Sequence, residues 1–307
     1  MLRSALSPLN RRQFLGATAG LLAAGAVSGS AAESKSYQLK WALASCMYGK
    51  LPLAEILPEV KKTGSEVLDI WPLPHGDQRE QIEKMGHDAF AELLDKHAVK
   101  LGILTHYRLG PFRLSEDAAF AKRFGVKLMI TGGSGPKNLK GDELKSAVKT
   151  FVKKLEPQLK IAEEHGYSIG IENHGNNLIE SPDSLRWLAE FSPSPRLGIA
   201  LAPYHLPQNP EQLGKLIEDL GDRLLHFYAW EHGHGCMTKL PKEEELLQLP
   251  ARGELNFGPV VSALETINFQ GWTEIFMHPV PRGIPILPTA SAVTAEINRN
   301  RRFLAEL

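Results

Sequence analysis

The sequence is poor in cysteine, has no excess of charge and lacks long hydrophobic runs. Its two cysteines, Cys46 and Cys236, are too few for a disulfide framework; we expect two unpaired thiols, with a pairing of the two as the alternative. The 35 Lys and Arg residues balance 35 Asp and Glu residues, so the excess of cations that nucleic-acid binding requires is missing. No segment reaches the about 20 apolar residues of a transmembrane helix. We therefore expect neither a nucleic-acid-binding protein nor a stable membrane span.

Residues 1–32 have the features of an export signal. Arginines precede a short apolar stretch at 14–27, and the first acidic residue is Glu33. Ser30-Ala31-Ala32 has the small-residue pattern of a cleavage site. The segment N-R-R-Q-F-L-G at 10–16 resembles the twin-arginine export motif. We therefore expect a twin-arginine signal peptide at 1–32, the twin-arginine machinery as a partner, and a periplasmic or extracellular mature chain; an uncleaved anchor helix is the alternative.

Short β-rich runs alternate with longer amphipathic ones along the rest of the chain. The expected strands are Lys40–Cys46, Glu66–Trp71, Val99–Thr105, Val126–Thr131, Ser168–Glu172, Leu197–Leu201, Leu224–Ala229 and Trp272–Met277. The expected helices are Leu53–Thr63, Gln78–His97, Ser115–Phe124, Asp142–His165, Ser181–Phe191, Pro210–Leu220, Gly258–Ile267 and Ala290–Leu307. This alternation predicts an α/β fold, a (β/α)8 TIM barrel, as a single domain at 38–305. A doubly wound open sheet is the competitor, but its G-x-G-x-x-G loop does not follow the first strand.

Histidines and acids gather where the expected strands end. They are His75, His106, His174, His205, His226, His232, His234 and His278, with Asp69, Glu172, Glu231 and Glu274. The active site of a TIM barrel lies at the carboxyl ends of its strands, so we expect these side chains to surround one site. Mixed histidine and carboxylate clusters bind Mn2+, Zn2+, Fe2+ or Co2+ as Lewis acids. Each histidine taken alone is more simply explained by hydrogen-bonded packing, so the prediction depends on their convergence.

Several segments resemble the xylose-isomerase-like barrels of the sugar phosphate isomerase and epimerase family, over most of residues 38–305. The matching segments are Ile169–His174, Pro203-Tyr204-His205, His226 in the seventh strand, Gly253–Phe257 and Gly271–Ile275. The resemblance implies proton removal beside a carbonyl of a small-molecule carbohydrate, by an isomerase, an epimerase or a related keto-sugar lyase. It also implies a divalent metal ion (Mn, Zn, Co or Fe), held by a glutamate, an aspartate, a histidine and a final glutamate.

Two of these four implied metal ligands are missing. Glu172 and His226 match the first glutamate and the histidine, but Ala202 replaces the aspartate and Phe276 replaces the final glutamate. One interpretation is a rebuilt metal site with the ligands Glu172, His205, His226 and His278. A second is metal-free proton transfer with Glu172 as base, and a third is a non-catalytic carbohydrate-binding barrel with a degenerate metal site. An endonuclease IV-like phosphodiesterase is a further rival, which the lack of basic charge disfavours.

The resemblance also suggests roles for individual residues. The expected catalytic residues are Glu172, in metal binding and proton transfer, and His205, as a ligand or general acid/base. The residues expected to bind substrate are Asp69, Trp71, His106, His174, Trp230 and Arg282. Hydroxyls would be held by the aspartate and by His106, the tryptophans would stack on the sugar ring, and the arginine would meet an anionic group. The structural alternatives are a strand-end hydrogen bond for Asp69, core packing for the two tryptophans and a loop salt bridge for Arg282.

Overall fold

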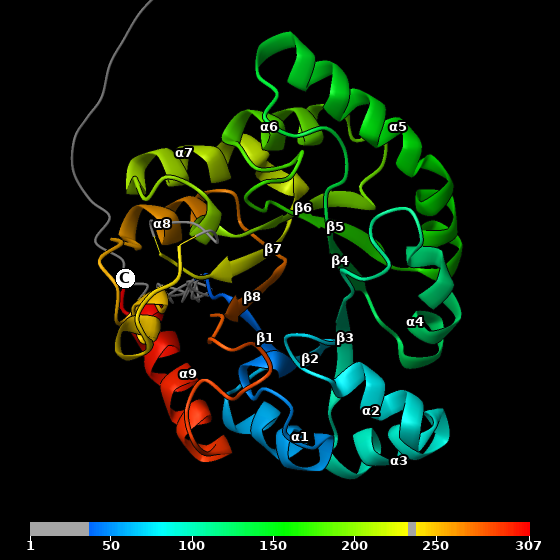
Figure 1. Cartoon of the computed structure of the whole chain (residues 1–307), viewed down its shortest axis with the longest axis vertical. Helices are drawn as coiled ribbons and strands as arrows, with labels where there is room; N and C mark the ends of the chain where they lie inside the picture. The colour runs from blue at the N-terminus through cyan, green and yellow to red at the C-terminus, as the bar shows by residue number, and fades with distance from the viewer. Residues whose placement is uncertain (1–36, 233–237) are drawn as a thin grey trace, which may run out of the picture. The chain divides into compact units, whose positions relative to one another are not determined.

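The computed structural model describes residues 37–232 and 238–307. Eight parallel strands close into a barrel in the order β1 to β8, and β8 pairs with β1. Figure 1 shows the helices arranged around this ring of strands. The predicted (β/α)8 TIM barrel is therefore confirmed.

The elements lie close to the positions that the alternation predicts. The strands are β1 (Lys40–Ala44), β2 (Val67–Ile70), β3 (Lys100–Thr105), β4 (Leu128–Gly132), β5 (Ser168–Glu172), β6 (Leu197–Leu201), β7 (Leu224–Ala229) and β8 (Trp272–Ile275). The α-helices are α1 (Leu53–Lys62), α2 (Gln78–Met85), α3 (His87–His97), α4 (Ala118–Phe124), α5 (Gly141–His165), α6 (Pro182–Phe191), α7 (Pro210–Leu220), α8 (Gly258–Thr266) and α9 (Ala290–Ala305). The 3-10 helices are η1 (Ser45–Met47), η2 (Leu114–Asp117), η3 (Pro203–His205), η4 (Gly221–Arg223) and η5 (Lys242–Gln248).

Local sequence signals start and stop several helices. The Ser181 hydroxyl accepts a hydrogen bond from Ser184 N at 3.2 Å, and a proline follows in the first turn of α6. Gly125 and Gly166 end α4 and α5 in the left-handed conformation, which glycine adopts without steric cost. The return of the chain from helix to strand is thus encoded locally at these positions.

Three expected elements differ from the structure. The predicted helix 78–97 is two helices, because Gly86 has φ +86° and ψ 153°, outside the helical region. The predicted helix 115–124 begins as the 3-10 turn η2. The eighth strand ends at Ile275, so Phe276 and His278 belong to the loop that follows it.

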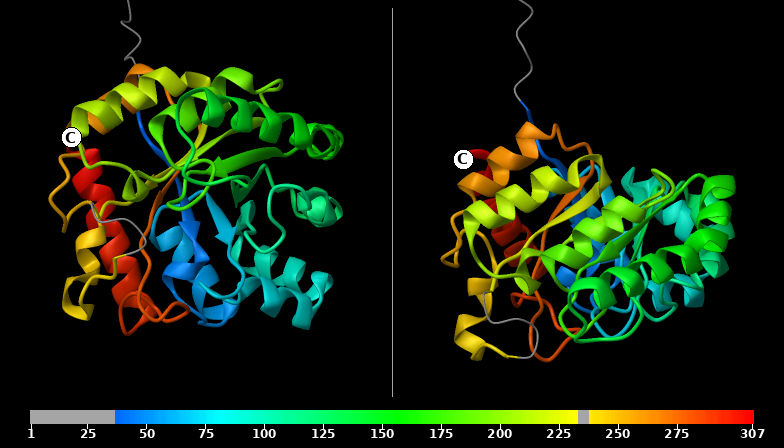
Figure 2. Two further views of the ribbon diagram at one scale, coloured as in Figure 1. Left: turned by 45° about the horizontal axis from the view of Figure 1, so that its top comes forward. Right: turned by 90° about the horizontal axis from the view of Figure 1, so that it is seen from above.

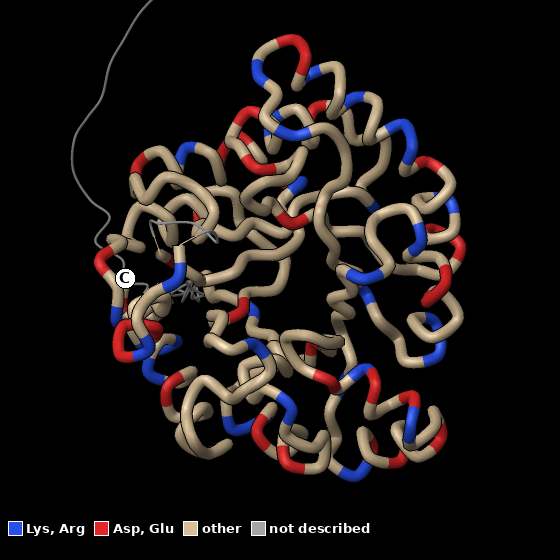
Figure 3. Tube along the Cα trace, in the orientation of Figure 1, with Lys and Arg blue, Asp and Glu red and all other residues tan. Residues whose placement is uncertain are grey.

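The strand register decides which side chains face the barrel interior. Side chains alternate along a strand, and paired residues of parallel neighbours point the same way. The register pairs Ala44 with Asp69, Glu172 with Ala200, Ala200 with His226, and Tyr228 with Glu274. The interior thus receives carboxyl, imidazole and phenol groups as well as apolar side chains. Figure 3 shows most other charged residues on the outer helices and loops.

Some sequence features lie outside the part of the chain that the structure describes. They are the predicted signal peptide at 1–32, His234 and Cys236. Cys46, by contrast, is a buried free thiol. Among the residues that the structure describes, no helix has the length and apolar character of a membrane span.

Candidate active site

A carboxyl and an imidazole meet at the carboxyl ends of β5 and β6. Glu172 is the last residue of β5, and His205 lies in the turn η3 that follows β6. His205 Nε2 is 3.8 Å from Glu172 Oε1, and both side chains are buried. Glu172 Oε2 and His205 Nε2 have no hydrogen-bond partner within the described residues. Buried polar atoms without partners cost free energy, so this pair is suited to receive a ligand.

The hydrogen bonds of two neighbouring histidines define their tautomers. Gly175 N donates to His205 Nδ1 at 3.3 Å, so the neutral ring carries its proton on Nε2, the atom nearest Glu172. His174 Nδ1 donates to Gly175 O at 2.8 Å, which leaves its Nε2 as an acceptor. The two ring centroids are 4.2 Å apart. The site therefore offers an N–H donor and an imidazole acceptor side by side.

Burial sets the charge states of the Glu172–His205 pair. It lowers the pKa of His205 to about 2, and nearby positive charges add to this effect. It also raises the pKa of Glu172 well above its ordinary value, reinforced by the charges of Glu274 and Asp69. A carboxyl with a raised pKa is a stronger base once ionised, whereas an imidazole with a lowered pKa stays neutral. The pair therefore combines a carboxyl whose raised pKa favours its protonated form, and which acts as a base once it has lost that proton, with a neutral hydrogen-bond donor.

A second pair lies deeper in the barrel. His226 Nε2 on β7 is 3.7 Å from Glu274 Oε2 on β8, and both side chains are fully buried. Both ring nitrogens of His226, both carboxyl oxygens of Glu274 and the Tyr228 hydroxyl lack partners in the described part of the chain. Burial lowers the pKa of His226 to about 3 and raises the pKa of Glu274 to about 8. Both groups are therefore mostly uncharged at neutral pH.

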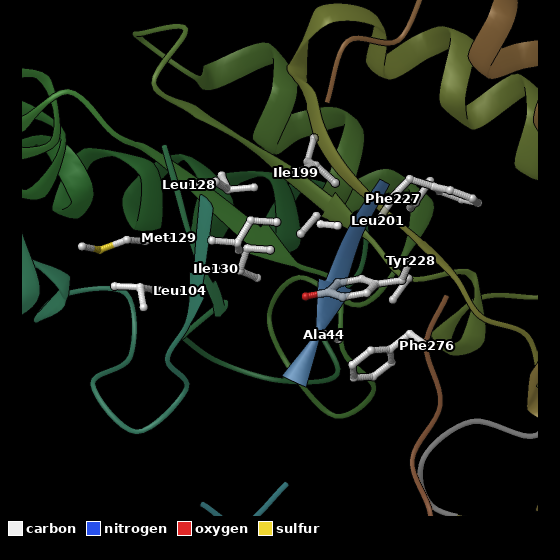
Figure 4. Close-up of a cluster of buried hydrophobic side chains, with 14 of the residues drawn as sticks. Ala44, Leu104, Leu128, Met129, Ile130, Ile199, Leu201, Phe227, Tyr228 and Phe276 are labelled. Atoms are coloured by element: carbon white, nitrogen blue, oxygen red, sulfur yellow. The ribbon is translucent and has the colours of Figure 1, made fainter. Parts of the chain in front are cut away.

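The Phe276 ring is linked to one histidine of each pair through a neighbouring ring. Its ring contacts those of Tyr228 and Trp230, each at 5.0 Å between centroids. Tyr228 in turn contacts His226, and Trp230 contacts His205. Figure 4 shows Tyr228 and Phe276 side by side within the barrel. An apolar ring thus fills the space where the resemblance implies a glutamate ligand.

The residues present do not fit a resident metal ion as they are arranged. Among residues 37–232 and 238–307, no three His, Cys, Asp or Glu side chains form a group that could hold one. The two pairs are separate, and His278, the fourth expected ligand, stacks on His75 at 4.3 Å. Ala202 offers only a methyl group at the expected aspartate position. Metal sites in proteins usually need three or four converging ligands, so the donor chemistry is suitable but its geometry is not.

The two tryptophans expected to stack on a sugar lie inside an aromatic cluster. Trp230 is fully buried, and Tyr204 stacks on it at 3.7 Å. Trp71 is 1% exposed and stacks on Phe276 at 5.0 Å. Neither ring offers an open face, so a stacking role stays a prediction that requires the cluster to open.

Asp69 and His106 both have protein partners. Asp69 Oδ1 accepts from Thr105 N at 3.0 Å, and Oδ2 accepts from the Thr105 hydroxyl at 2.7 Å. His106 follows Thr105 and turns to the opposite face, where Nδ1 is 2.7 Å from Asp117 Oδ2. Arg79 binds the same carboxylate at 2.8 Å. Both oxygens of Asp69 are therefore engaged with the neighbouring strand, whereas His106 Nε2 has no hydrogen-bond partner among the described residues, so its hydroxyl-binding role stays a prediction. Thr105 was not among the expected site residues, although alternation along β3 is a sequence signal that points to it.

The remaining expected residues lie at the barrel mouth. His278 and Arg282 line a pocket of about 520 Å³. Tyr204, which also lines it, has its ring 4.7 Å from that of His205. The pocket is therefore linked to His205 of the Glu172–His205 pair through the Tyr204 ring.

The buried carboxyl of Glu274 predicts a pH dependence of stability. Burial raises its pKa from 4.5 to about 8, so the folded chain keeps a proton that the unfolded chain releases. The stability contributed by this group is fully present below pH 4.5 and is lost as the pH rises through 8. The Glu274→Gln variant has no carboxyl to ionise at this position. The difference between its free energy of unfolding and that of wild type should therefore rise by roughly 1–4 kcal/mol from pH 5 to pH 9.

Urea unfolding of both proteins at the two pH values measures this difference. Glu156→Gln, an exposed change on α5, is the matched control and should leave the pH dependence unchanged. Parallel pH curves for Glu274→Gln and wild type would contradict the prediction.

Comparison with known proteins agrees with the fold. No curated protein matches the sequence. The IolI protein with a bound zinc atom has a TM-score of 0.68 and 17% identity, over 87% of this chain and 98% of that one. D-psicose 3-epimerase with D-tagatose, from Clostridium cellulolyticum H10, has a TM-score of 0.63 and 16% identity, over 87% and 99%. The probable 3-DHS dehydratase AsbF from Bacillus anthracis has a TM-score of 0.61 and 14% identity, over 84% and 97%.

At such low identities the structural likeness is evidence for the fold alone. The sequence itself matches a family description, xylose isomerase-like TIM barrel, over residues 57–297. This match runs from α1 to α9 and includes every strand from β2 to β8. The chain therefore belongs to the xylose isomerase-like TIM barrel family.

Proposed function

We propose that this chain is a sugar isomerase or epimerase that moves a proton beside a carbonyl group of a carbohydrate. Glu172 acts as the base, and His205 is a neutral hydrogen-bond donor. The observation that supports this most is the buried pair itself, with 3.8 Å between His205 Nε2 and Glu172 Oε1. A carboxylate base beside a neutral imidazole is a recurrent solution for proton transfer next to a carbonyl.

The reaction follows from the roles of these groups. Ionised Glu172 takes the proton from the carbon beside the carbonyl, and the C–H electron pair moves into an enediolate. His205 donates its Nε2–H to the oxygen on which negative charge develops. Return of the proton by Glu172 to the neighbouring carbon, with a proton passing between the two oxygens, gives an isomer. An epimer forms when water delivers a proton to the original carbon from the opposite face and Glu172 releases to solvent the proton that it took. His174 accepts a hydrogen bond from a substrate hydroxyl through its Nε2.

A metal-assisted form of the same reaction is the alternative. It is supported by the unpartnered atoms of His226 and Glu274 in the described residues, and by the zinc atom of the similar IolI structure. A divalent ion, when bound, supplies Lewis-acid stabilisation of the oxyanion. It would require Phe276 to move, because the donor pairs do not converge. Activity that survives dialysis against a chelator supports the metal-free form, and loss with recovery on adding Mn2+, Zn2+, Co2+ or Fe2+ supports the metal form.

Hydrogen exchange in heavy water tests the proposed function. The full chain is incubated with a panel of ketoses and aldoses, and proton NMR follows the hydrogen beside each carbonyl. We expect deuterium to replace it in at least one sugar. Sugar binding without any exchange would overturn the enzyme and favour the non-catalytic carbohydrate-binding barrel. The absence of both exchange and binding would contradict the enzyme and the carbohydrate-binding barrel alike.

We also propose that the twin-arginine machinery exports the chain, on the evidence of its first residues. Replacing Arg11 and Arg12 together by lysine should retain the protein in the cytoplasm, because the paired arginines are the feature that the export route reads. Cell fractionation and immunoblotting measure the distribution, and Arg3→Lys is the matched control. Unchanged export of the double variant would contradict this route.

A further inference from the structure

The pocket at the barrel mouth has basic side chains whose charge is not balanced within its lining. Its ionisable lining residues are Arg282, Lys239, His232, His278 and Glu245. The carboxylate of Glu245 is already engaged, since Oε1 accepts from Val280 N at 2.7 Å and Oε2 accepts from Lys242 Nζ. Within the described lining, no carboxylate is therefore left to neutralise Arg282.

Arg282 itself is exposed and makes no hydrogen bond or ion pair with any residue that the structure describes. Its positive charge nevertheless acts on the groups around it. It helps to lower the pKa of the mouth histidines His75, His174, His205 and His278. It also opposes the rise in the pKa of Glu172. Arg282 and Tyr204 line the same pocket, and the Tyr204 ring is 4.7 Å from that of His205, so a substrate bound by the guanidinium can extend toward the proposed reaction site.

The loop that carries Arg282 is anchored on both sides. The anchoring hydrogen bonds are Val280 N to Glu245 Oε1 at 2.7 Å, Gln248 Nε2 to His278 O at 3.0 Å, and Lys50 N to Gly283 O at 3.2 Å. Gly283 has φ +83°, and a Cβ there would lie 2.8 Å from Lys50 Cε and 3.0 Å from Pro74 O. Figure 2 shows η5 and this loop side by side at one end of the barrel. The Arg282 side chain thus starts from a fixed backbone, which reduces the entropy lost on binding.

The shape and charge of Arg282 favour a carboxylate. Its planar guanidinium fork matches a planar carboxylate through two parallel hydrogen bonds, and one guanidinium neutralises one carboxylate.

We propose that the substrate is a sugar acid whose carboxylate is bound by Arg282 in this pocket. The carbonyl end of the same molecule then faces the Glu172–His205 pair. The identity of the pocket ligand as a substrate rests on the proposed function, but carboxylate binding by Arg282 does not require turnover.

Calorimetry of binding to the full chain tests this. The probes are D-glucuronate and D-galacturonate, each compared with its neutral counterpart, D-glucose and D-galactose. At low salt we expect each acid to bind at least about tenfold more tightly than its counterpart, and this preference to weaken as salt is added. Arg282→Gln should abolish the preference. Arg302→Gln, an exposed change on α9, is the matched control and should retain it.

Several results would overturn the proposal. They are equal affinity for acid and neutral sugar, a preference that survives Arg282→Gln, and no measurable binding of either acid. Tighter, Arg282-dependent binding of D-glucose 6-phosphate than of D-glucuronate would overturn the carboxylate in favour of a phosphate. An acid preference without any hydrogen exchange in heavy water would overturn the proposed reaction and still support carboxylate binding.

Discussion

Glu172→Gln is expected to slow proton exchange beside the substrate carbonyl by about 10²–10⁴-fold, the usual contribution of a general base. Glutamine keeps the size of the side chain but cannot accept a proton from carbon. Glu172 is 3% exposed and lies at the end of β5, so the substitution acts at the barrel interior. The measurement is deuterium incorporation by NMR over a range of sugar concentrations, in which the loss should appear in kcat.

Two further variants separate the base from its neighbours. Glu156→Gln, on an exposed part of α5, should keep the wild-type rate. His205→Gln retains an N–H donor, so it should lose less activity than His205→Leu if His205 acts as a donor. Undiminished exchange in Glu172→Gln would contradict the assignment of the base. Equal loss in the two His205 variants would contradict the role of the donor.

Phe276→Ala is expected to lower the free energy of unfolding by about 3–5 kcal/mol, the range for removing a buried phenyl ring. The Phe276 side chain is 1% exposed and packs between Trp71, Tyr228 and Trp230 at 5.0 Å between ring centroids. Its removal leaves a cavity that these large rings cannot fill without moving. Urea unfolding, with the slope compared between proteins, measures the change.

Phe112 supplies the control for this prediction. It is 37% exposed, so Phe112→Ala should cost less than about 1 kcal/mol. A loss of similar size in the two variants would contradict the central packing of Phe276. The comparison therefore tests whether the Phe276 ring is packed in the core of the barrel.

The sequence alone is sufficient to predict the barrel and the inward direction of several site residues. The spacing of hydrophobic residues distinguishes strands from helices. Eight repeats of a strand followed by a helix leave few alternatives to a closed barrel. Because side chains alternate along a strand, the order of residues is enough to assign Glu172, His226 and Glu274 each to a face of its strand. The replacement of expected ligands by Ala202 and Phe276 is equally visible in the sequence.

Only the tertiary structure decided how these side chains combine. It shows that Phe276 lies among three aromatic rings and that His226 pairs with Glu274 instead of joining Glu172. His106 turns to Asp117, a residue that no periodic pattern links to it. Alternation determines the face of a strand that a side chain occupies. Packing between residues remote in sequence decides how far apart side chains from different strands lie. It also decides where side chains beyond a strand end point. This packing forms only when the barrel closes.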